Sequence, residues 1–216
     1  MECRTLAYLE GRTIGLDGVV AQQGNYQKSG FALAHRNVRY QGMGSGENCS
    51  TDLADTPLLQ RGGLVKSFSD KILKFVALST LPLSATEAYD LPFFPAGRWE
   101  FLQCWIRQPQ HVALGILQNG ALAGYGVLRP CRTGYKIGPL FADTPELADR
   151  LFLALQSHAT DTAPVFLDIP AMNPAAVALV ERHGMVPVFE TARMYKGKPL
   201  DLPLNRLFGV SSFELG

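Results

Sequence analysis

The spacing of apolar residues predicts strands and helices in alternation along most of the chain. Strands are expected where β-branched and aromatic residues alternate with polar ones, and helices where apolar residues recur every three or four positions. In chain order the pattern predicts the end of a helix over residues 3–10, a strand over 13–20, a short helix over 22–28, strands over 31–41 and 73–78, a helical turn over 84–89, a helix over 98–106, strands over 112–117, 121–129 and 135–141, a helix from 144, a strand over 165–169, a helix over 173–182 and strands over 186–195 and 208–215.

Two local signals fix individual boundaries. Asn119-Gly120 lies between two strand-like runs, and this pair favours a tight hairpin because both residues adopt positive φ readily. Thr144-Pro145-Glu146 combines a side-chain cap, a proline at the first helical position and an acid in the first turn. A hairpin and a helix start are therefore expected at these places.

A strand–helix–strand phrase occurs twice in the chain. The first copy contains Asp17, Gly30 and Tyr40, and the second contains Asp168, Gly184 and Tyr195. The spacing between the aspartate and the glycine differs by three residues, and that between the glycine and the tyrosine by one. A diverged repeat separated by about 150 residues indicates two related domains, because solenoid repeats have periods of only about 20 to 50 residues.

The composition excludes several kinds of recognition. Lys and Arg number 20 against 19 Asp and Glu, so no net charge favours nucleic acid or an anionic membrane. The four cysteines are scattered without a CxxC pair, which is typical of reduced thiols rather than of a metal site. No secretory signal opens the sequence, and no apolar run approaches about 20 residues. We expect a cytoplasmic protein without a metal.

The element order and the second copy of the phrase resemble the Gcn5-related N-acetyltransferase (GNAT) family. The residues that match its late helix are Asn173, Ala176, Leu179, Gly184 and Met185. The resemblance covers the chain from about residue 71 to its end. It implies an α/β (α+β) fold in which helices flank a mixed twisted sheet.

The chain is more specifically similar to double-domain members of this family. Residues 134–140 and the closing residues 213–216 match segments that recur in them. On this basis residues 1–42 are the C-terminal portion of a first GNAT domain, and residues 69–216 are a complete, diverged second one. Residues 43–68 are rich in Gly, Ser, Asp and Thr and form a linker between the two.

The resemblance implies transfer of an acetyl group from acetyl-CoA to an amine, often with a tyrosine on the late helix as the general acid. Tyr26 stands four residues before Gly30 and matches that position, whereas Val180 occupies it in the second copy. A phenol with a pKa near 10 can protonate a thiolate whose pKa is about 8.5 or above. The resemblance also makes Asn173 a cofactor-binding residue. Alternatively, Tyr26 only packs and Asn173 only caps a helix.

The family holds the pyrophosphate of CoA on backbone amides of a glycine-containing loop at a helix N-terminus. The matching segment here departs from that pattern. Asp143 replaces a cation or amide, Pro145 removes a donor and Glu146 adds a second carboxylate. Carboxylates repel a pyrophosphate, so we expect that the second domain does not bind CoA in the standard way. The loop of the first domain would lie upstream of Met1.

The acceptor is expected to be a small-molecule or peptide amine. Arg129, Arg132 and Tyr135 form a cationic and aromatic cluster that could bind a carboxylate or phosphate of the substrate, or could be the solvated end of a hairpin. The four histidines and the serines lack a nucleophile motif, which argues against a hydrolase. A second hypothesis is a non-catalytic GNAT-like binding or regulatory module. Residues 1–42 could also self-associate through an incomplete sheet.

Overall fold

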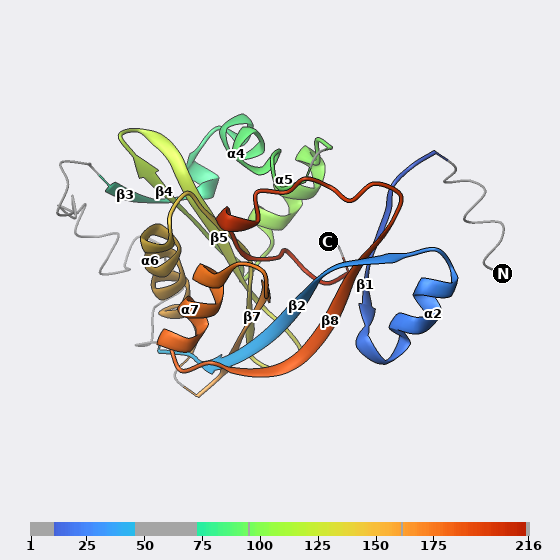
Figure 1. Cartoon of the computed structure of the whole chain (residues 1–216). Helices are drawn as coiled ribbons and strands as arrows, with labels where there is room; N and C mark the ends of the chain where they lie inside the picture. Colours follow the sequence, from blue (N-terminus) through green and yellow to red (C-terminus); the bar gives the residue numbers. More distant parts are fainter. Residues whose placement is uncertain (1–10, 46–72, 95, 161, 215–216) are drawn as a thin grey trace.

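The computed structural model describes residues 11–45, 73–94, 96–160 and 162–214 (Figure 1). The predicted helix end over residues 3–10 and most of the predicted linker lie outside these ranges. The strands are β1 (Ile14–Val19), β2 (Ala32–Met43), β3 (Leu73–Ala77), β4 (Val112–Gln118), β5 (Ala121–Pro130), β6 (Tyr135–Ala142), β7 (Pro164–Pro170), β8 (Val186–Lys196) and β9 (Leu207–Gly209). The α-helices are α2 (Gln23–Lys28), α4 (Leu83–Asp90), α5 (Trp99–Arg107), α6 (Pro145–Gln156) and α7 (Pro174–Arg182).

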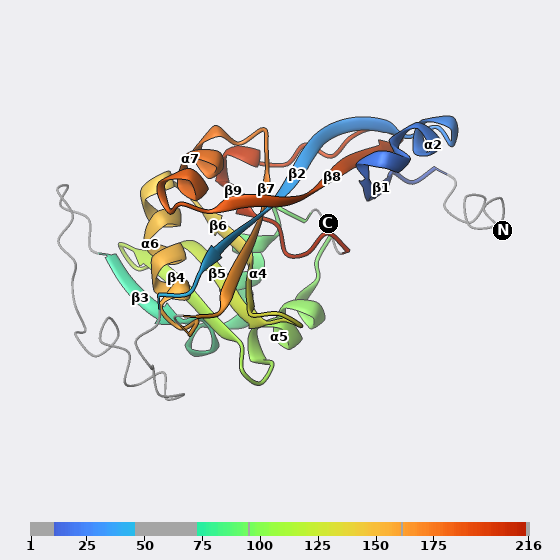
Figure 2. The same ribbon diagram turned by 90° about the horizontal axis from the view of Figure 1, so that it is seen from below.

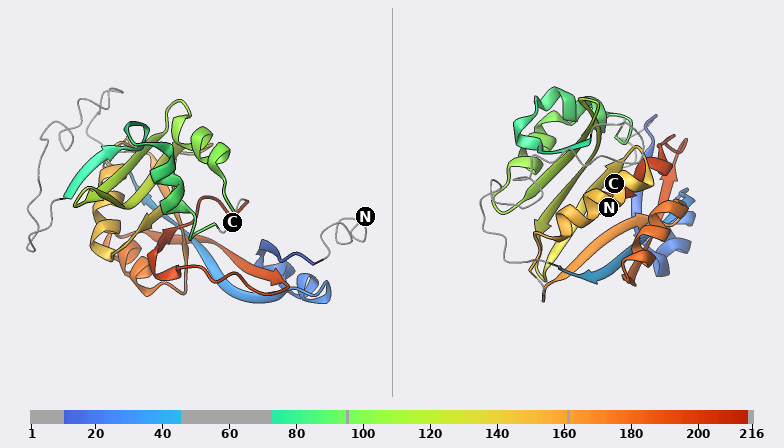
Figure 3. Two further views of the ribbon diagram at one scale, coloured as in Figure 1. Left: turned by 90° about the horizontal axis from the view of Figure 1, so that it is seen from above. Right: turned by 90° about the vertical axis from the view of Figure 1, so that its left-hand side faces the viewer.

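These elements form a mixed sheet flanked by helices, which confirms the predicted fold class. The strand order is β1-β8-β2-β7-β6-β5-β4-β3, and β9 pairs with β6 beside this path. The β6–β7 pair is parallel, and the other pairs are antiparallel. Figures 2 and 3 show β2 and β8 as long, twisted strands that extend from the body of the sheet toward β1 and α2.

The two local signals act as predicted. Asn119 and Gly120 have φ values of 52° and 85°, and they join β4 to β5. The hydroxyl oxygen of Thr144 accepts a hydrogen bond from the Leu147 amide at 3.4 Å, so α6 begins with the expected side-chain cap. Short-range chemistry is therefore sufficient to define these boundaries.

Apolar residues fill two layers, one on each face of the sheet. One layer joins α6 and α7 to the sheet through residues such as Leu151, Phe152 and Leu179. The other joins α4–α5 and the C-terminal segment through residues such as Leu102 and Phe213. The sheet therefore has a helical layer on each face, and the C-terminal segment belongs to the α5 side.

The two copies of the repeated phrase interlock in the sheet. The first copy is β1–α2–β2 and the second is β7–α7–β8, and the last strand of each copy lies between the two strands of the other. Asn37 of β2 lies opposite Thr191 of β8 near the middle of the β2–β8 pair. The copies are thus related by an approximate twofold axis that passes close to this pair.

The closing strand predicted over residues 208–215 is wrong over residues 210–214, and residue 215 lies outside the described ranges. β9 pairs with β6 only from Leu207 to Gly209, and the chain then crosses toward β7, where the Val210 amide donates a hydrogen bond to the Asp168 carbonyl at 2.9 Å. β6 and β7 pair directly only over the first three residues of this ladder, Tyr135 to Ile137. The C-terminal segment therefore lies in the gap that opens between these two strands.

Candidate functional site

Tyr26 lies on α2 with its ring against β1. A Cβ atom added at Gly18 would be 2.4 Å from Cε2 of Tyr26, so glycine is needed for this close approach. Tyr26 is half-buried. Among the described residues, β1 pairs with β8 alone, which leaves its other edge open. The predicted acid therefore packs on an edge strand, and its catalytic role stays a prediction.

Asn173 is the N-cap of α7 and is only 2% exposed. Its Oδ1 accepts hydrogen bonds from the amides of Ala175 and Ala176 at 3.1 and 3.3 Å. Its Nδ2 donates to the carbonyl of Leu207 in β9 at 2.9 Å. The side chain thus caps α7 and links it to β9 by a hydrogen bond. Its role in cofactor binding stays a prediction.

Arg129, Arg132 and Tyr135 lie together at the turn between β5 and β6. The Arg129 guanidinium is 5.2 Å from the centre of the Trp105 ring, and its buried Nε has no hydrogen-bond partner among the described residues. Arg132 is exposed and Tyr135 is half-buried. β6 is four strands from β1, which corresponds to roughly 20 Å across a sheet. This cluster is therefore separate from Tyr26.

The start of α6 carries an internal ion pair. The carboxylate of Asp143 accepts hydrogen bonds from Arg206 at 2.6 Å and from the Tyr89 hydroxyl at 2.8 Å. Burial, followed by the hydrogen bond to Asp143, raises the pKa of the Tyr89 phenol. The Thr144 hydroxyl lowers the pKa of Glu146, so that carboxyl remains an anion near the helix N-terminus. Both carboxylates disfavour a second anion at this position.

Two groups of ion pairs, each around a buried aspartate, join strands of the two repeats. Asp17 of β1 pairs with Arg193 of β8, and Asp168 of β7 pairs with Arg39 of β2, each at 2.7 Å. Lys136 of β6 also donates to Asp168. Burial lowers the pKa of Lys136, and the Asp168 charge opposes that shift. These pairs were not predicted from the sequence, although the matched Asp17 and Asp168 of the repeat were a signal for them.

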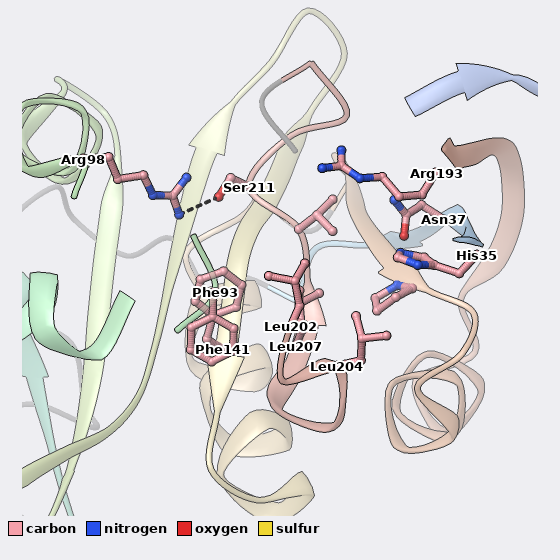
Figure 4. Close-up of a pocket in the computed structure, with 12 residues that line it drawn as sticks. His35, Asn37, Phe93, Arg98, Phe141, Arg193, Leu202, Leu204, Leu207 and Ser211 are labelled. Atoms are coloured by element: carbon pink, nitrogen blue, oxygen red, sulfur yellow. Dashed lines mark hydrogen bonds between the residues drawn. The ribbon is translucent and has the colours of Figure 1, made fainter. Parts of the chain in front are cut away.

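A small cavity lies beside the Asp17–Arg193 pair, between the repeats and the C-terminal segment (Figure 4). Its lining comes from strands β2, β6, β7, β8 and β9, from the segment that precedes α5 and from the segments on either side of β9; the residues are His35, Asn37, Phe93, Arg98, Phe141, Pro170, Arg193, Leu202, Leu204, Leu207, Val210 and Ser211. Burial, followed by the charge of Arg193, lowers the pKa of His35. None of these residues was singled out as a site residue from the sequence.

Within the described ranges, no helix is both long and apolar enough to span a membrane. In the same ranges, no three or more His, Cys, Asp or Glu side chains gather in a way that could hold a metal ion.

Comparison with known proteins identifies the family. The model of a family described as "Acetyltransferase (GNAT) domain" matches residues 86–209, which is more than half of the chain. Holothin acyltransferase from Pseudoalteromonas sp. (strain SANK 73390) is 23% identical over 209 residues, which cover 97% of this chain and 64% of that protein.

Solved structures show the same fold. A protein from Pyrococcus horikoshii assigned as an acetyltransferase has a TM-score of 0.68 at 22% identity, covering 98% of this chain and 63% of its own. A GCN5-related N-acetyltransferase from Sphaerobacter thermophilus has a TM-score of 0.55 at 14% identity, covering 88% of this chain and 62% of its own. The chain thus spans just under two thirds of the length of these relatives. It belongs to the GNAT family.

Proposed function

We propose that this protein transfers an acetyl group from acetyl-CoA to an amine of a small molecule or peptide, with Tyr26 as the general acid. The observation that carries the proposal is the position of Tyr26. It lies on α2, the helix that follows β1, and its ring packs against Gly18 of β1, which pairs on one side only among the described residues. The similarity to holothin acyltransferase supports acyl transfer to a small molecule.

The proposed reaction has two steps: the amine adds to the thioester, and the thiolate is then eliminated. The amine nitrogen attacks the thioester carbonyl, and the C–S bond then breaks. The CoA thiolate takes the phenolic proton of Tyr26, and the new amide loses its extra proton to water or a carboxylate. Tyr26 regains a proton from solvent. Phenols in general can make this transfer, because the reference pKa values of a phenol and a thiol, about 10 and about 8.5, lie close together.

Three features favour the first repeat over the second as the catalytic part. Val180 stands where the first copy has Tyr26, and a valine has no proton to give. Asp143 and Arg206 form their own ion pair at the start of α6. β9 pairs with β6 in the gap beside β7. We therefore propose the double-domain arrangement, with residues 1–42 as part of the catalytic domain and residues 69–216 as an accessory domain.

The test is an assay of CoA release from acetyl-CoA with a panel of amines. Tyr26→Phe should reduce turnover by about 10²–10⁴-fold, the usual contribution of a general acid. Tyr40→Phe is the matched control, because Tyr40 also belongs to the first repeat but lies on β2, away from α2. Unchanged turnover in Tyr26→Phe would remove this residue from the mechanism.

We also propose that Arg129, Arg132 and Tyr135 bind a carboxylate or phosphate of the substrate. The Arg129 Nε supports this role, because it is buried without a partner among the residues that the structure describes, and such a donor is unfavourable. Arg129→Met should then raise KM for an anionic acceptor and leave KM for a neutral one unchanged. Equal KM changes for both acceptors would contradict the proposal.

The second candidate function is a non-catalytic GNAT-like binding or regulatory module. The hydrogen bond from Asn173 to β9 favours it for residues 69–216, because it commits the proposed cofactor residue to the chain itself. Acetyl-CoA distinguishes the two candidates. A thermal shift of the purified chain that grows with acetyl-CoA concentration supports the transferase, and its absence supports the module.

A further inference from the structure

Residues 197–206 form a strap that crosses the junction of the two repeats on its way from β8 to β9. None of its residues is buried. Among the described residues, the hydrogen bonds that join it to other segments lie at its two ends. At one end the Lys198 carbonyl accepts from the Thr13 hydroxyl at 3.0 Å, and at the other Arg206 donates to Asp143 at 2.6 Å. The middle of the strap is therefore held by side-chain packing, and a segment with so few buried contacts opens more easily than the core.

His35 lies beneath this strap. Leu202 and Leu204 of the strap line the same cavity as the His35 ring (Figure 4). A shift in the β2–β8 register between Leu33 and His35 places His35 opposite Arg193 of β8. The cavity measures about 30 Å³, which is room for one or two water molecules. A protonated imidazole could not be fully hydrated there while the strap is closed.

The surroundings of His35 favour a neutral ring. Burial, followed by the charge of Arg193, lowers the pKa of His35, and the charge of Asp17 and a hydrogen bond with Asn37 oppose this shift without cancelling it. Asp17 is already paired with Arg193 at 2.7 Å. A proton on the ring would therefore add a second cation beside a carboxylate that already has one.

The other elements around the cavity do not supply a partner for that cation. None of the described residues that line the cavity is a carboxylate. Arg98, which precedes α5, is the other cation of the lining, and it pairs with Asp90 at 2.7 Å. On the strap itself, Lys198 and Asp201 are exposed, and Arg206 has its own ion pair. Water that enters when the strap opens is the remaining way to stabilise the charge.

We propose that the 197–206 strap is a lid opened by acid: it is closed while His35 is neutral, and a proton on His35 opens it. The closed state has the lower His35 pKa, and a ring hydrated in the open state has the ordinary value of about 6.5. The open state therefore binds the proton more readily. Its population is lowest above pH 6.5 and rises as the pH falls below that value. The inference requires neither acetyl-CoA nor a catalytic role for Tyr26.

Hydrogen exchange of the ¹⁵N-labelled full chain at pH 5.5 and 7.5 tests the proposal. Protection factors are compared, because they correct for the intrinsic effect of pH on exchange. The amides of Leu204 and Arg206 bond to the Leu202 and Pro203 carbonyls at 2.8 and 2.9 Å and report on the strap. Their protection should fall by up to about tenfold at pH 5.5, because a group with a pKa of about 6.5 is protonated about tenfold over at that pH.

An amide outside the strap separates local opening from general loosening. The Met185 amide bonds to the Val180 carbonyl at 2.9 Å, between α7 and β8, and its protection should change much less than that of the strap. An equal loss of protection at Met185 and in the strap would contradict a lid, and so would strap protection that is the same at both pH values.

Two histidine variants identify the group that titrates. His35→Gln should abolish the pH dependence of strap protection. His111→Gln is the matched control and should preserve it, because burial also lowers the pKa of His111, but this residue precedes β4 and does not line the cavity. Circular dichroism checks folding, and His35→Asn replaces His35→Gln if the latter is unfolded. A pH dependence that survives without His35, or that disappears in His111→Gln, would overturn the proposal.

Discussion

Asp17 and Arg193 are 176 residues apart in sequence and form a buried ion pair at 2.7 Å. Its counterpart joins Asp168 to Arg39 at the same distance. In each pair, the aspartate belongs to the outer strand of one repeat and the arginine to the inner strand of the other. Each repeat therefore supplies an arginine to the buried aspartate of the other, and Lys136 of β6 adds a second cation at Asp168.

This dependence predicts a large effect of removing one arginine. Arg193→Met leaves the Asp17 carboxylate buried without its cation, with the uncharged Asn37 and Thr191 side chains still donating to it, and it should lower the free energy of unfolding by about 3–5 kcal/mol. Arg182→Met is the control, because the Arg182 side chain is 56% exposed beside Asp149; it should cost less than about 1 kcal/mol. Urea denaturation measures both. Equal losses would show that the Asp17 pair is no more important than a surface pair.

The sequence was sufficient for the elements whose causes are local. The hairpin at Asn119-Gly120 and the capped start of α6 at Thr144 depend on a few adjacent residues, and both are present. The pairing of the strands was not predictable in this way, because the β2–β8 pair depends on contacts between residues far apart in sequence. The closing strand was overextended for the same reason, since Val210 bonds to β7 rather than to β6.

The candidate site was predictable only in part. Tyr26 is proposed because its spacing from Gly30 matches a family motif, and its role stays a prediction. The cavity beside His35 and Asn37 could not, because it exists only where the two repeats and the C-terminal segment meet. The repeat itself was visible, but no spacing rule shows that one copy lies between the strands of the other.

The contact between Tyr26 and β1 predicts opposite effects at two glycines. Gly18→Ala would place a methyl group 2.4 Å from the Tyr26 ring and should destabilise the chain by about 1–3 kcal/mol while lowering any CoA-release activity. Gly24→Ala has nothing within 4 Å and lies inside α2, so it should stabilise by about 0.5–1 kcal/mol. Thermal unfolding and the CoA-release assay measure both effects. A stable, fully active Gly18→Ala would mean that the ring position does not matter.

Burial of histidines predicts a loss of stability on mild acidification. Burial lowers the pKa of His158 in the folded chain, and the unfolded chain keeps the ordinary value of about 6.5. Below pH 6.5 the unfolded state therefore binds more protons, so the stabilisation present above that pH is lost as the pH falls through the folded pKa. The slope contributed by one histidine cannot exceed about 1.4 kcal/mol per pH unit.

Urea denaturation at pH 5.5 and 7.5 measures this dependence. His158→Gln should reduce the difference between the two pH values, and His35 and His111, whose pKa values are also lowered by burial, should supply the rest. Between pH 7.5 and 8.5 the native chain and the variant should change equally, because the histidines are then neutral in both states. An unchanged difference in His158→Gln would show that His158 does not titrate with unfolding.

The position of the C-terminal segment depends on the absence of a side chain at Gly138. A Cβ atom there would be 2.7 Å from the carbonyl oxygens of both Val210 and Ser211, and backbone atoms cannot turn aside as a flexible side chain can. Gly138→Ala should therefore displace residues 207–213, cost about 1–3 kcal/mol and speed hydrogen exchange of the Val210 amide, which bonds to Asp168. Gly97→Ala is the control, because its nearest neighbour is the mobile end of Glu87 at 3.4 Å. If both variants exchange at the native rate, β9 is not held in the gap by close packing against β6.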